Sequence, residues 1–493
     1  MTSEEVRQTA QQIGRRTAHG IIWNFLAYGL GRLVVLVTTS ILARILSKTE
    51  FGLVAVAVVA INYLSVIKDL GLGVALIQKK GDIEEAADTV FTANLFIGLA
   101  MSLLVIPLSP WIAAYFKDPA ITPVLRWMGV TFLLNALGSV HVNRLMRELD
   151  YRRKFIPDMG NSIVKGVVSI AMAFAGYGVW SLVFGQLLGT LASVILVWII
   201  LPWRPRLSFN RAIATGLMKF GVTITGDDVL NQIIDNIDYV IVGRMFGLVQ
   251  LSIYTLGYRL PEMLLIGNLW IMGGVMFPAF SRVQDRPSEL RRGFLASIRV
   301  VEMIALPVSV GLFIAADPIV RVVFGDQWLE VIPVLRVLAI YGWIYSIGYH
   351  VGGVYKAIGR PDIIFKLSLL TLVIILPALL IGARLGGIIG VAFGHLTAIL
   401  IRRVISLTLA TRYVDVSIGD MFDQLKPSFL GVLVMAPAAL GALYLTAGVN
   451  VFIQLAVVAL VGAAAYMAVL WWLERDSLLQ MARVIGLSRE SAG

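Results

Sequence analysis

Apolar runs of about twenty residues follow one another along almost the whole chain, separated by short polar connections. A helix needs about 20 apolar residues to cross the hydrocarbon core of a bilayer. The pattern therefore predicts an all-α polytopic membrane protein with about 14 transmembrane helices. The predicted segments are 20–43, 51–75, 88–110, 121–142, 156–176, 178–201, 213–243, 250–279, 296–316, 331–354, 363–384, 386–410, 427–446 and 450–472.

The seventh segment differs from the others because it carries four aspartates: Asp227, Asp228, Asp235 and Asp238. At about 100° per residue, three of them fall within roughly 80° of one another, and Asp228 lies only slightly outside. A charge at the bilayer centre costs at least ~2.5 kcal/mol, so such groups face a water-lined cavity or a partner. The stripe predicts a path or binding site inside the membrane.

Composition agrees with this class, since 58% of the residues are hydrophobic, 14% are charged and the mean hydropathy is +0.85. Lys and Arg are concentrated in connections after even-numbered segments, such as 144–154 and 282–299. The positive-inside rule places these connections and both termini, 1–17 and 474–493, in the cytoplasm. The net charge of +11 is therefore interpreted as a topology signal with a minor attraction to anionic lipids, and no nucleic-acid partner is expected.

Several chemical classes are not expected. The chain has no cysteine, which excludes disulfides and thiolate metal sites. The first apolar run is too long for a cleavable signal peptide. No connection can house a nucleotide-binding domain and no GxxxxGK[ST] motif is present. We expect no enzyme, no cofactor and no metal site, and energy from an ion gradient, the membrane potential or the substrate's own gradient. If an ion is coupled, H+ and Na+ are the candidates.

Short motifs recur about 210 residues apart. Phe-Gly-Gln-Leu at 184–187 matches Phe-Gly-His-Leu at 393–396, and Val-Leu-Arg at 124–126 recurs at 334–336. The repeats predict two six-helix bundles, with an extra helix pair after them. Because six is even, the bundles are parallel repeats, which place a transport site between the halves. The predicted bounds are 18–203 and 212–411 for the bundles and 425–473 for the pair.

The duplication also predicts a partner for the aspartates. Arg32 lies in the middle of the first segment, at the position that corresponds to Gln232 in the seventh. If these helices face each other, Arg32 points towards Asp228 and Asp235. Glu262 in the eighth segment corresponds to Asn62 in the second, so both halves place a polar side chain there.

Two regions resemble a known family. Leu-Ser-Lys-Thr-Glu-Phe-Gly-Leu at 46–53, with Asp-Leu-Gly-Leu-Gly at 69–73 and Ala-Leu-Ile-Gln at 75–78, is similar to the N-terminal signature of bacterial polysaccharide transporters. So are Ile-Asp-Asn-Ile-Asp-Tyr at 234–239 and Tyr-Thr-Leu-Gly-Tyr at 254–258. The chain resembles Wzx-type flippases of the multidrug/oligosaccharidyl-lipid/polysaccharide superfamily, in particular the colanic-acid and teichuronic-acid exporter group.

The resemblance implies translocation of an undecaprenyl-diphosphate-linked oligosaccharide across the bacterial inner membrane for lipopolysaccharide or exopolysaccharide synthesis. It implies a cationic cavity, coupling to an ion gradient and a polysaccharide polymerase as a possible partner. For the diphosphate the candidates are three cations, because Arg and Lys bind phosphate: Arg32, Lys165 and Arg259. For the sugars the candidates are hydroxyl and amide side chains: Asn24, Tyr28, Asn62, Asn161 and Tyr258.

The acidic residues have two functional interpretations: ion carriers in antiport, or a gate that holds Arg32. The set is Asp227, Asp228, Asp235, Asp238 and Glu262. Alternatives without a transport role also exist. Arg32 and Lys165 could form structural ion pairs, and Asp238 could simply be solvated at the outer end. Glu302, near the start of the ninth segment, is expected at the membrane interface.

Glycines at four-residue spacing predict close helix packing; they are Gly185 with Gly189, and Gly386 with Gly390 and Gly394. Three histidines, His141, His350 and His395, are too scattered to indicate a metal site. Two other functions compete with the flippase. A multidrug or cation antiporter of the same superfamily would have an acidic cavity without Arg32 and Lys165. A membrane polymerase or ligase would need a larger outer loop than 111–121 or 316–331 provides.

Overall fold

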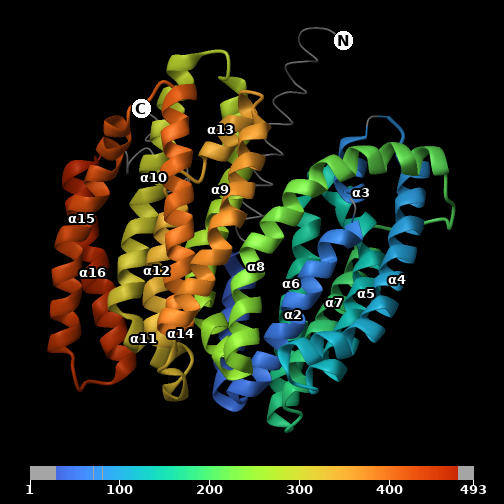
Figure 1. The fold of residues 1–493 in the computed structure, drawn as a ribbon, viewed down its shortest axis with the longest axis horizontal. Helices are drawn as coiled ribbons and strands as arrows, with labels where there is room; N and C mark the ends of the chain where they lie inside the picture. Colours follow the sequence, from blue (N-terminus) through green and yellow to red (C-terminus); the bar gives the residue numbers. More distant parts are fainter. Residues whose placement is uncertain (1–28, 70, 80, 476–493) are drawn as a thin grey trace, which may run out of the picture. The chain divides into compact units, whose positions relative to one another are not determined.

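The computed structural model describes residues 29–69, 71–79 and 81–475, with the side chains of 66–69, 220–228, 270, 271, 274 and 275 left undefined. Within these ranges all regular structure is helical (Figure 1). The all-α prediction is therefore confirmed for the described residues. By compactness the chain divides into two units, Met1–Ser252 and Ile253–Gly493.

Unit 1 contains the helix at residues 29–45, six further helices and the first section of α8. The six helices are α2 (Lys48–Asp69), α3 (Leu72–Gln78), α4 (Glu84–Phe116), α5 (Ile121–Arg147), α6 (Tyr151–Phe174) and α7 (Val179–Ile200). Local chemistry sets their ends. Gly71 has φ 71° before α3, and Gly178 has φ 52° before α7, conformations that glycine adopts without steric cost. The Asp150 side chain caps α6 by accepting a 3.0 Å hydrogen bond from the Arg153 amide.

The segment between α7 and α8 is fixed to the ends of α4 and α5. Trp203 donates its indole N–H to Glu84 at 3.0 Å, and the Arg144 guanidinium donates two bonds to the same carboxylate at 3.0 and 2.7 Å. His141 is fully buried and stacks on Trp198, with ring centroids 4.7 Å apart. These contacts hold the connection between the two predicted repeats against unit 1.

Helix α8 (Arg211–Pro261) is 51 residues long and bends at Gly247, where φ is 83°. Its first section belongs to unit 1. Gly52 of α2 leaves no room for a Cβ against the Leu248 carbonyl, and a Cβ on Gly243 would lie 2.8 Å from the Phe116 ring. The boundary between the units therefore falls after Ser252, whereas the repeat boundary is predicted near 203–212 and stays a prediction.

Unit 2 begins with the last residues of α8 and continues through ten further elements. They are η1 (Glu262–Ile266), α9 (Gly267–Arg282), α10 (Pro287–Ile314), α11 (Ala316–Val323), η2 (Asp326–Trp328), α12 (Val331–Ser346), α13 (Val351–Ala357), α14 (Pro361–Tyr413), α15 (Ile418–Leu445) and α16 (Val451–Leu473). Helix α15 begins with a capping box, in which Ser417 and Asp420 satisfy each other's backbone N–H groups. Helices α15 and α16 pack side by side, and both contact α10 (Figure 1).

Helix α14 contains 53 residues, about 80 Å at 1.5 Å per residue, which is too long for one crossing. It bends at Gly386 and Gly387, where Gly387 has φ 58°. Gly382 and Gly390 then approach so closely that neither leaves room for a Cβ against the other's carbonyl. The helix is therefore a hairpin of two packed arms, as the predicted segments 363–384 and 386–410 require.

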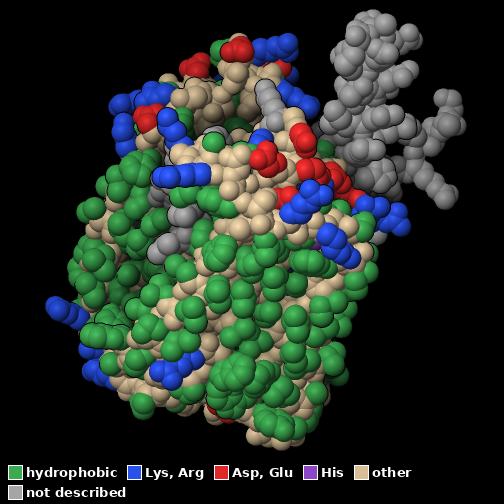
Figure 2. Space-filling model, turned by 90° about the vertical axis from the view of Figure 1, so that its right-hand side faces the viewer, with side chains coloured by type: hydrophobic (Ala, Val, Ile, Leu, Met, Phe, Trp, Pro, Cys, Tyr) green, Lys and Arg blue, Asp and Glu red, His purple; other side chains and the backbone are tan. Residues whose placement is uncertain are grey.

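In the described ranges, ten helical stretches are long and apolar enough to cross a membrane, and two of them contain the bends of α8 and α14. Helix α6 is not among them, since its first turns are polar. The protein is thus a multi-pass membrane protein, and the count of fourteen stays a prediction. On the face drawn in Figure 2, hydrophobic side chains cover the middle and charged side chains gather mainly towards one end.

Candidate functional site

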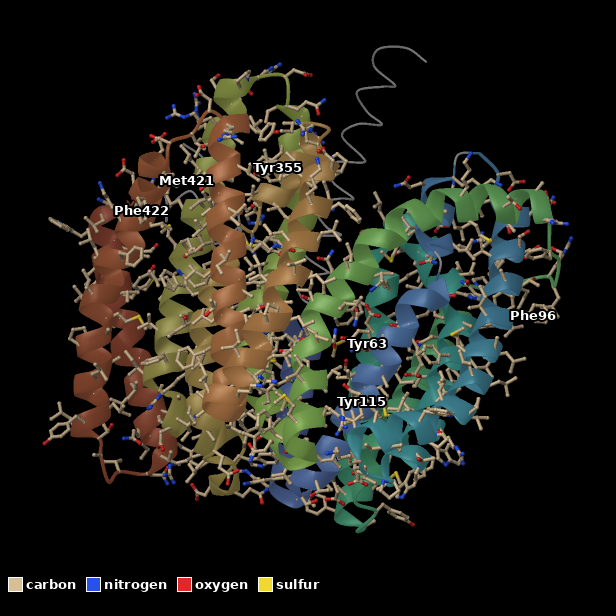
Figure 3. The ribbon with its side chains drawn as sticks, in the orientation of Figure 1. Tyr63, Phe96, Tyr115, Tyr355, Met421 and Phe422 are labelled. Atoms are coloured by element: carbon tan, nitrogen blue, oxygen red, sulfur yellow. The ribbon has the colours of Figure 1, made fainter. Side chains whose placement is uncertain are left out.

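The described part of the aspartate stripe faces α2 inside unit 1. Asp238 is fully buried, and Asp235 is exposed. The Tyr63 hydroxyl of α2 donates to the Ile233 carbonyl at 3.4 Å and lies within electrostatic range of both carboxyl groups. Figure 3 shows Tyr63 beside α8. The alternative that Asp238 is merely solvated is wrong, because packing against neighbouring helices excludes water from it.

Some predicted residues cannot be placed. Asn24 and Tyr28 lie outside the described residues, as does the predicted cytoplasmic segment 1–17. The helix is described at Asp227 and Asp228, but their side chains are not.

Arg32 lies half-buried on the helix at residues 29–45. This helix packs on α6: a Cβ on Gly31 would lie 3.6 Å from the Ser162 hydroxyl, and a Cβ on Gly166 would lie 2.5 Å from the Thr38 hydroxyl. These contacts place the first helix against α6, the helix that carries Lys165. The predicted approach of Arg32 to Asp228 and Asp235 stays a prediction.

Lys165 has a defined environment between α6 and α7. Its ammonium group donates a 2.5 Å hydrogen bond to the Gln186 side-chain carbonyl. A Cβ on Gly189 would lie 2.8 Å from the Lys165 Cβ and 2.9 Å from the Asn161 carbonyl, so the two helices are in backbone contact here. One partner of this half-buried cation is therefore a neutral amide, which does not neutralise its charge.

The glycine prediction is confirmed at four of five positions. Gly185 and Gly189 pack on α6, while Gly390 and Gly394 of the second arm of α14 pack on its first arm. Gly386 is the exception, because an added Cβ would meet nothing within 4 Å. It lies in the bend of the hairpin, where the arms separate, and so makes no close contact.

The remaining predicted residues are half-buried and lie at different points. Asn62 precedes Tyr63 on α2. Arg259 lies near the end of α8, and Glu262 begins the π-helical turn η1. π-Helical turns within α-helices are frequent at functional sites. Glu262 and Arg259 belong to unit 2, whereas Asn62 belongs to unit 1.

Unit 2 contains a row of aromatic rings that the sequence analysis did not identify. Tyr341, Tyr345 and Tyr349 follow one another at four-residue spacing, with centroids 5.9 and 5.8 Å apart. His395 lies 4.4 Å from the Tyr341 ring and stacks on Tyr258 at 6.3 Å. The four-residue period of the tyrosines was the available signal, since this spacing places helix residues on one face. Tyr341 and Tyr345 lie on α12, and Tyr349 lies in the turn that follows it.

The prediction that Glu302 is interfacial is wrong. Glu302 is fully buried in α10. Its carboxyl oxygens lie 2.8 Å from the Trp343 indole nitrogen and 2.9 Å from the Ser346 hydroxyl oxygen. The apolar run begins near residue 296, but the helix begins at Pro287. Glu302 is therefore in the fifth turn of the helix rather than the second, well inside the bundle.

Arg403 of α14 also contacts the end of α12. It is 9% exposed, donates a 2.5 Å hydrogen bond to the Tyr345 carbonyl and places its guanidinium carbon 4.9 Å from the centre of the Tyr345 ring. Its Nε has no hydrogen-bond partner, nor has Nε2 of the 4%-exposed His350. Arg403 is inconspicuous in the sequence, because with Arg402 it forms a basic pair near the end of the predicted segment 386–410.

No group of three or more His, Asp or Glu side chains among the described residues is arranged to hold a metal ion. Two charged groups, Glu302 and Arg403, are instead buried against hydroxyl, indole, carbonyl and ring groups. Ionisable side chains inside membrane helices are typical of transport proteins.

Comparison with known families decides the class of this membrane protein. A family model described as "Polysaccharide biosynthesis protein" matches residues 41–333, more than half of the chain. The chain belongs to this family. Its sequence is 28% identical over 401 residues to the lipopolysaccharide biosynthesis protein WzxC of Escherichia coli K12, covering 79% of this chain and 80% of WzxC.

A second similar protein is the teichuronic acid biosynthesis protein TuaB of Bacillus subtilis 168. It is 25% identical over 463 residues, which cover 93% of this chain and 96% of TuaB. Among solved structures, the inward closed conformation of the lipid II flippase MurJ matches with a TM-score of 0.76. The match covers 93% of this chain and all of that chain at 17% identity. At this identity the match shows a shared transporter fold, and the family assignment rests on the sequence.

Proposed function

We propose that this polysaccharide biosynthesis protein is a flippase that moves a polyprenyl-diphosphate-linked oligosaccharide from the cytoplasmic to the outer leaflet of the bacterial inner membrane. The observation that carries the proposal is the family match over residues 41–333 in a chain with the fold of a lipid II flippase. The name of that protein gives lipid II as its cargo, and the names of WzxC and TuaB give lipopolysaccharide and teichuronic acid biosynthesis.

The charges of the chain support an anionic cargo. Lys165 is a half-buried cation with a neutral amide partner, and Arg32 is half-buried on the helix that packs beside it. Cations in a low-dielectric site bind a diphosphate strongly, Arg as a bidentate donor and Lys as a point charge. A drug-cation antiporter would instead repel its cargo at these positions. We assign Arg32 and Lys165 to the diphosphate, with Arg259 as a further contact.

The acidic residues belong to the energy-coupling part of the cycle, since carboxylates repel a diphosphate. Asp235 and Asp238 face Tyr63, and Glu262 begins η1. In this proposal they bind H+ or Na+, or form a gate with Arg32, during alternating access between inward-open and outward-open states. Both termini lie in the cytoplasm, and a membrane polymerase receives the flipped units.

The decisive experiment is deletion of the gene in cells that make the surface polysaccharide. We expect the polysaccharide to disappear and the lipid-linked units to accumulate on the cytoplasmic leaflet, where an impermeant glycan-modifying reagent cannot reach them in spheroplasts. Expression of the wild-type chain from a plasmid restores export. Unchanged surface polysaccharide in the deletion strain would refute the flippase assignment, and altered drug resistance instead would favour the antiporter.

A further inference from the structure

The hydrogen bonds around the buried carboxyl group of Glu302 indicate its protonation state. The Ser346 hydroxyl oxygen lies 2.6 Å from the Trp343 carbonyl and 2.9 Å from Oε1 of Glu302. A serine hydroxyl has one hydrogen and can donate one linear bond. Both neighbours of that oxygen are oxygens, so a second proton is needed to make both contacts hydrogen bonds.

The carboxyl group is the available source of that proton. If Ser346 donates to the Trp343 carbonyl, the shorter contact, then a protonated Glu302 donates from Oε1 to the Ser346 oxygen. The Trp343 indole N–H donates to Oε2 at 2.8 Å, which a neutral carboxyl group also accepts. Both carboxyl oxygens, the Ser346 hydroxyl and the indole N–H and carbonyl of Trp343 then each have a hydrogen-bond partner.

Burial favours the same protonation state. Glu302 is 0% exposed and Ser346 is 1% exposed. Glu302 makes no ion pair with any residue that the structure describes, although it lies within electrostatic range of Arg403. A carboxylate without an ion-pair partner in the membrane interior is strongly disfavoured relative to the neutral acid.

The alternative partner for a deprotonated Glu302 is Arg403. The guanidinium group is buried, its Nε–H is unpartnered, and it bonds the Tyr345 carbonyl next to Ser346. Tyr345 and Ser346 are the last two residues of α12, and the chain then turns through Ile347–His350 before α13 begins. A carboxylate attracted to Arg403 would release Ser346 and pull on the end of α12.

This turn breaks the helical span. Gly348 has φ 65°, and the helix is interrupted for four residues in the second half of Val331–Ala357, a stretch long enough to cross the membrane. Discontinuous helices in transporters mark the positions where ions act, because their free backbone groups lie at membrane depth.

We propose that Glu302 binds a proton in the conformation seen here and that releasing this proton to the solvent moves the carboxylate from Ser346 to Arg403, which rearranges the break between α12 and α13. No bond other than the O–H bond of the carboxyl group is broken. The other charged or titratable groups near Glu302 and Arg403 are Tyr341, Tyr345, Tyr349, His350, Arg402 and Tyr466. None of them is a carboxylate, so Glu302 is the only acid in this group.

The C-terminal helix pair covers this acid. Tyr466 of α16 donates a 2.9 Å hydrogen bond to the carbonyl of Met303, the next residue after Glu302. Phe429 of α15 packs edge-on against Trp343 at 5.8 Å. The pair thereby closes one side of the Glu302 site.

The first test reads protonation directly and does not depend on transport. Purified protein in nanodiscs is examined at neutral pH by infrared spectroscopy for the C=O stretch of a protonated carboxyl group. We expect the Glu302→Gln variant to lack one such band that the wild type shows, while the Glu289→Gln variant, altered at an exposed acid of the same helix, keeps it. Identical carboxylic-acid bands in the wild type and Glu302→Gln would overturn the proposal.

Glu302→Gln is a suitable variant because its amide reproduces both contacts of the protonated carboxyl group. One N–H of the amide donates to Ser346 and the amide oxygen accepts from Trp343, while the second N–H is an added donor. We therefore expect a folded protein with slightly lowered thermal stability, arrested in the form that mimics the protonated acid.

The second test asks whether the proton is used, and it rests on the proposed export function. Polysaccharide appearance at the surface is followed while the external pH is stepped. We expect Glu302→Gln to lower the export rate at least tenfold and to remove its pH dependence, with Glu302→Asp restoring part of both. Wild-type export and pH response in Glu302→Gln would refute the coupling role, whereas a failure of the gene deletion to affect polysaccharide would refute export and leave the infrared result standing.

Discussion

A charged side chain within a transmembrane bundle can persist only where particular neighbours stabilise it, and here three such residues have three different solutions. Lys165 bonds the neutral amide of Gln186, and Arg403 uses a carbonyl and a tyrosine ring. Glu302 is surrounded by hydroxyl and indole groups. Lys165 is half-buried and Arg403 is buried, so Lys165 is the one of these two cations that an anion can reach.

Replacing Lys165 by methionine tests its role in cargo binding. The change removes the charge and keeps an unbranched side chain of nearly the same length. We expect export to fall about tenfold or more, because losing one charge-assisted contact costs at least ~1.4 kcal/mol, which corresponds to a factor of ten. Lys165→Arg should keep most of the activity. Surface polysaccharide per unit of membrane protein measures both.

The control is Lys154→Met on the same helix, because Lys154 is neutralised by Asp158 at 2.6 Å. Its export should stay near the wild-type rate. Equal losses in both variants would mean that α6 only needs its charges for membrane insertion, and Lys165 would lose its assignment.

Tyr63→Phe tests the contact between α2 and the aspartates. It removes only the hydroxyl that bonds Ile233 and faces Asp235 and Asp238. The free energy of unfolding should change by about 1 kcal/mol or less, since the bond is long and neutral. We expect export to fall severalfold if the hydroxyl orients the carboxylates.

Tyr115→Phe provides the comparison, because the Tyr115 ring lies 5.2 Å from the Arg244 guanidinium and a phenylalanine ring keeps that contact. It should export normally. Wild-type export rates in both variants would show that the Tyr63 hydroxyl has no role in the aspartate cluster.

At the level of helices, the α14 hairpin depends on glycine at one position and not at another four residues away. Gly390 meets the Gly382 carbonyl, so Gly390→Ala must separate the arms; we expect a loss of about 1–3 kcal/mol, the usual cost of overpacking. Gly386→Ala adds a methyl group where nothing lies within 4 Å and φ is −144°. Thermal unfolding in detergent should separate the two variants, and equal melting temperatures would contradict the hairpin contact.

The sequence predicted helices well where apolar runs and helices coincide, and poorly where a helix extends beyond its apolar part. The two arms of α14 match 363–384 and 386–410 because glycines mark the bend. Glu302 was predicted too close to the start of its helix, because the polar first turns of α10 lie outside the apolar run from which the segment was predicted. Gly386 was grouped with Gly390 because both follow the same four-residue spacing. That spacing shows which helix face a residue lies on, but it does not show that the helix bends at Gly386.

The candidate site shows the same limit. Lys165 and the aspartates were identifiable because a charge inside an apolar run is conspicuous in one dimension. Arg403 and the tyrosine row were not, since their surroundings come from α10, α12 and α14, which are distant in sequence. The protonation state of Glu302 depends on three oxygens, those of Ser346 and Trp343 in α12 and of Glu302 in α10. A sequence pattern does not show that these atoms meet.

For the whole molecule, the internal duplication predicts that equivalent contacts recur in each unit. Gly185 packs against the Lys165 carbonyl in unit 1, and Gly394 packs against the Ala378 carbonyl in unit 2. The residues that follow them, Gln186 and His395, each contact a polar partner of their own unit. These recurrences agree with parallel repeats, whose sidedness stays a prediction.

The absence of cysteine makes that sidedness measurable, because a single introduced thiol is then the only reactive one. The basic connections are expected in the cytoplasm. Cysteines replacing Asp82 in unit 1 or Asp285 in unit 2 should therefore react with an impermeant maleimide only after spheroplasts are opened. Cysteines replacing Ala120 or Gln327, exposed at the opposite ends of their units' helices, should react in intact spheroplasts. The wild-type chain serves as the unlabelled blank. If Ala120→Cys and Gln327→Cys differed in accessibility, the two units would have opposite orientations and the parallel repeat, with the site it predicts between the halves, would be wrong.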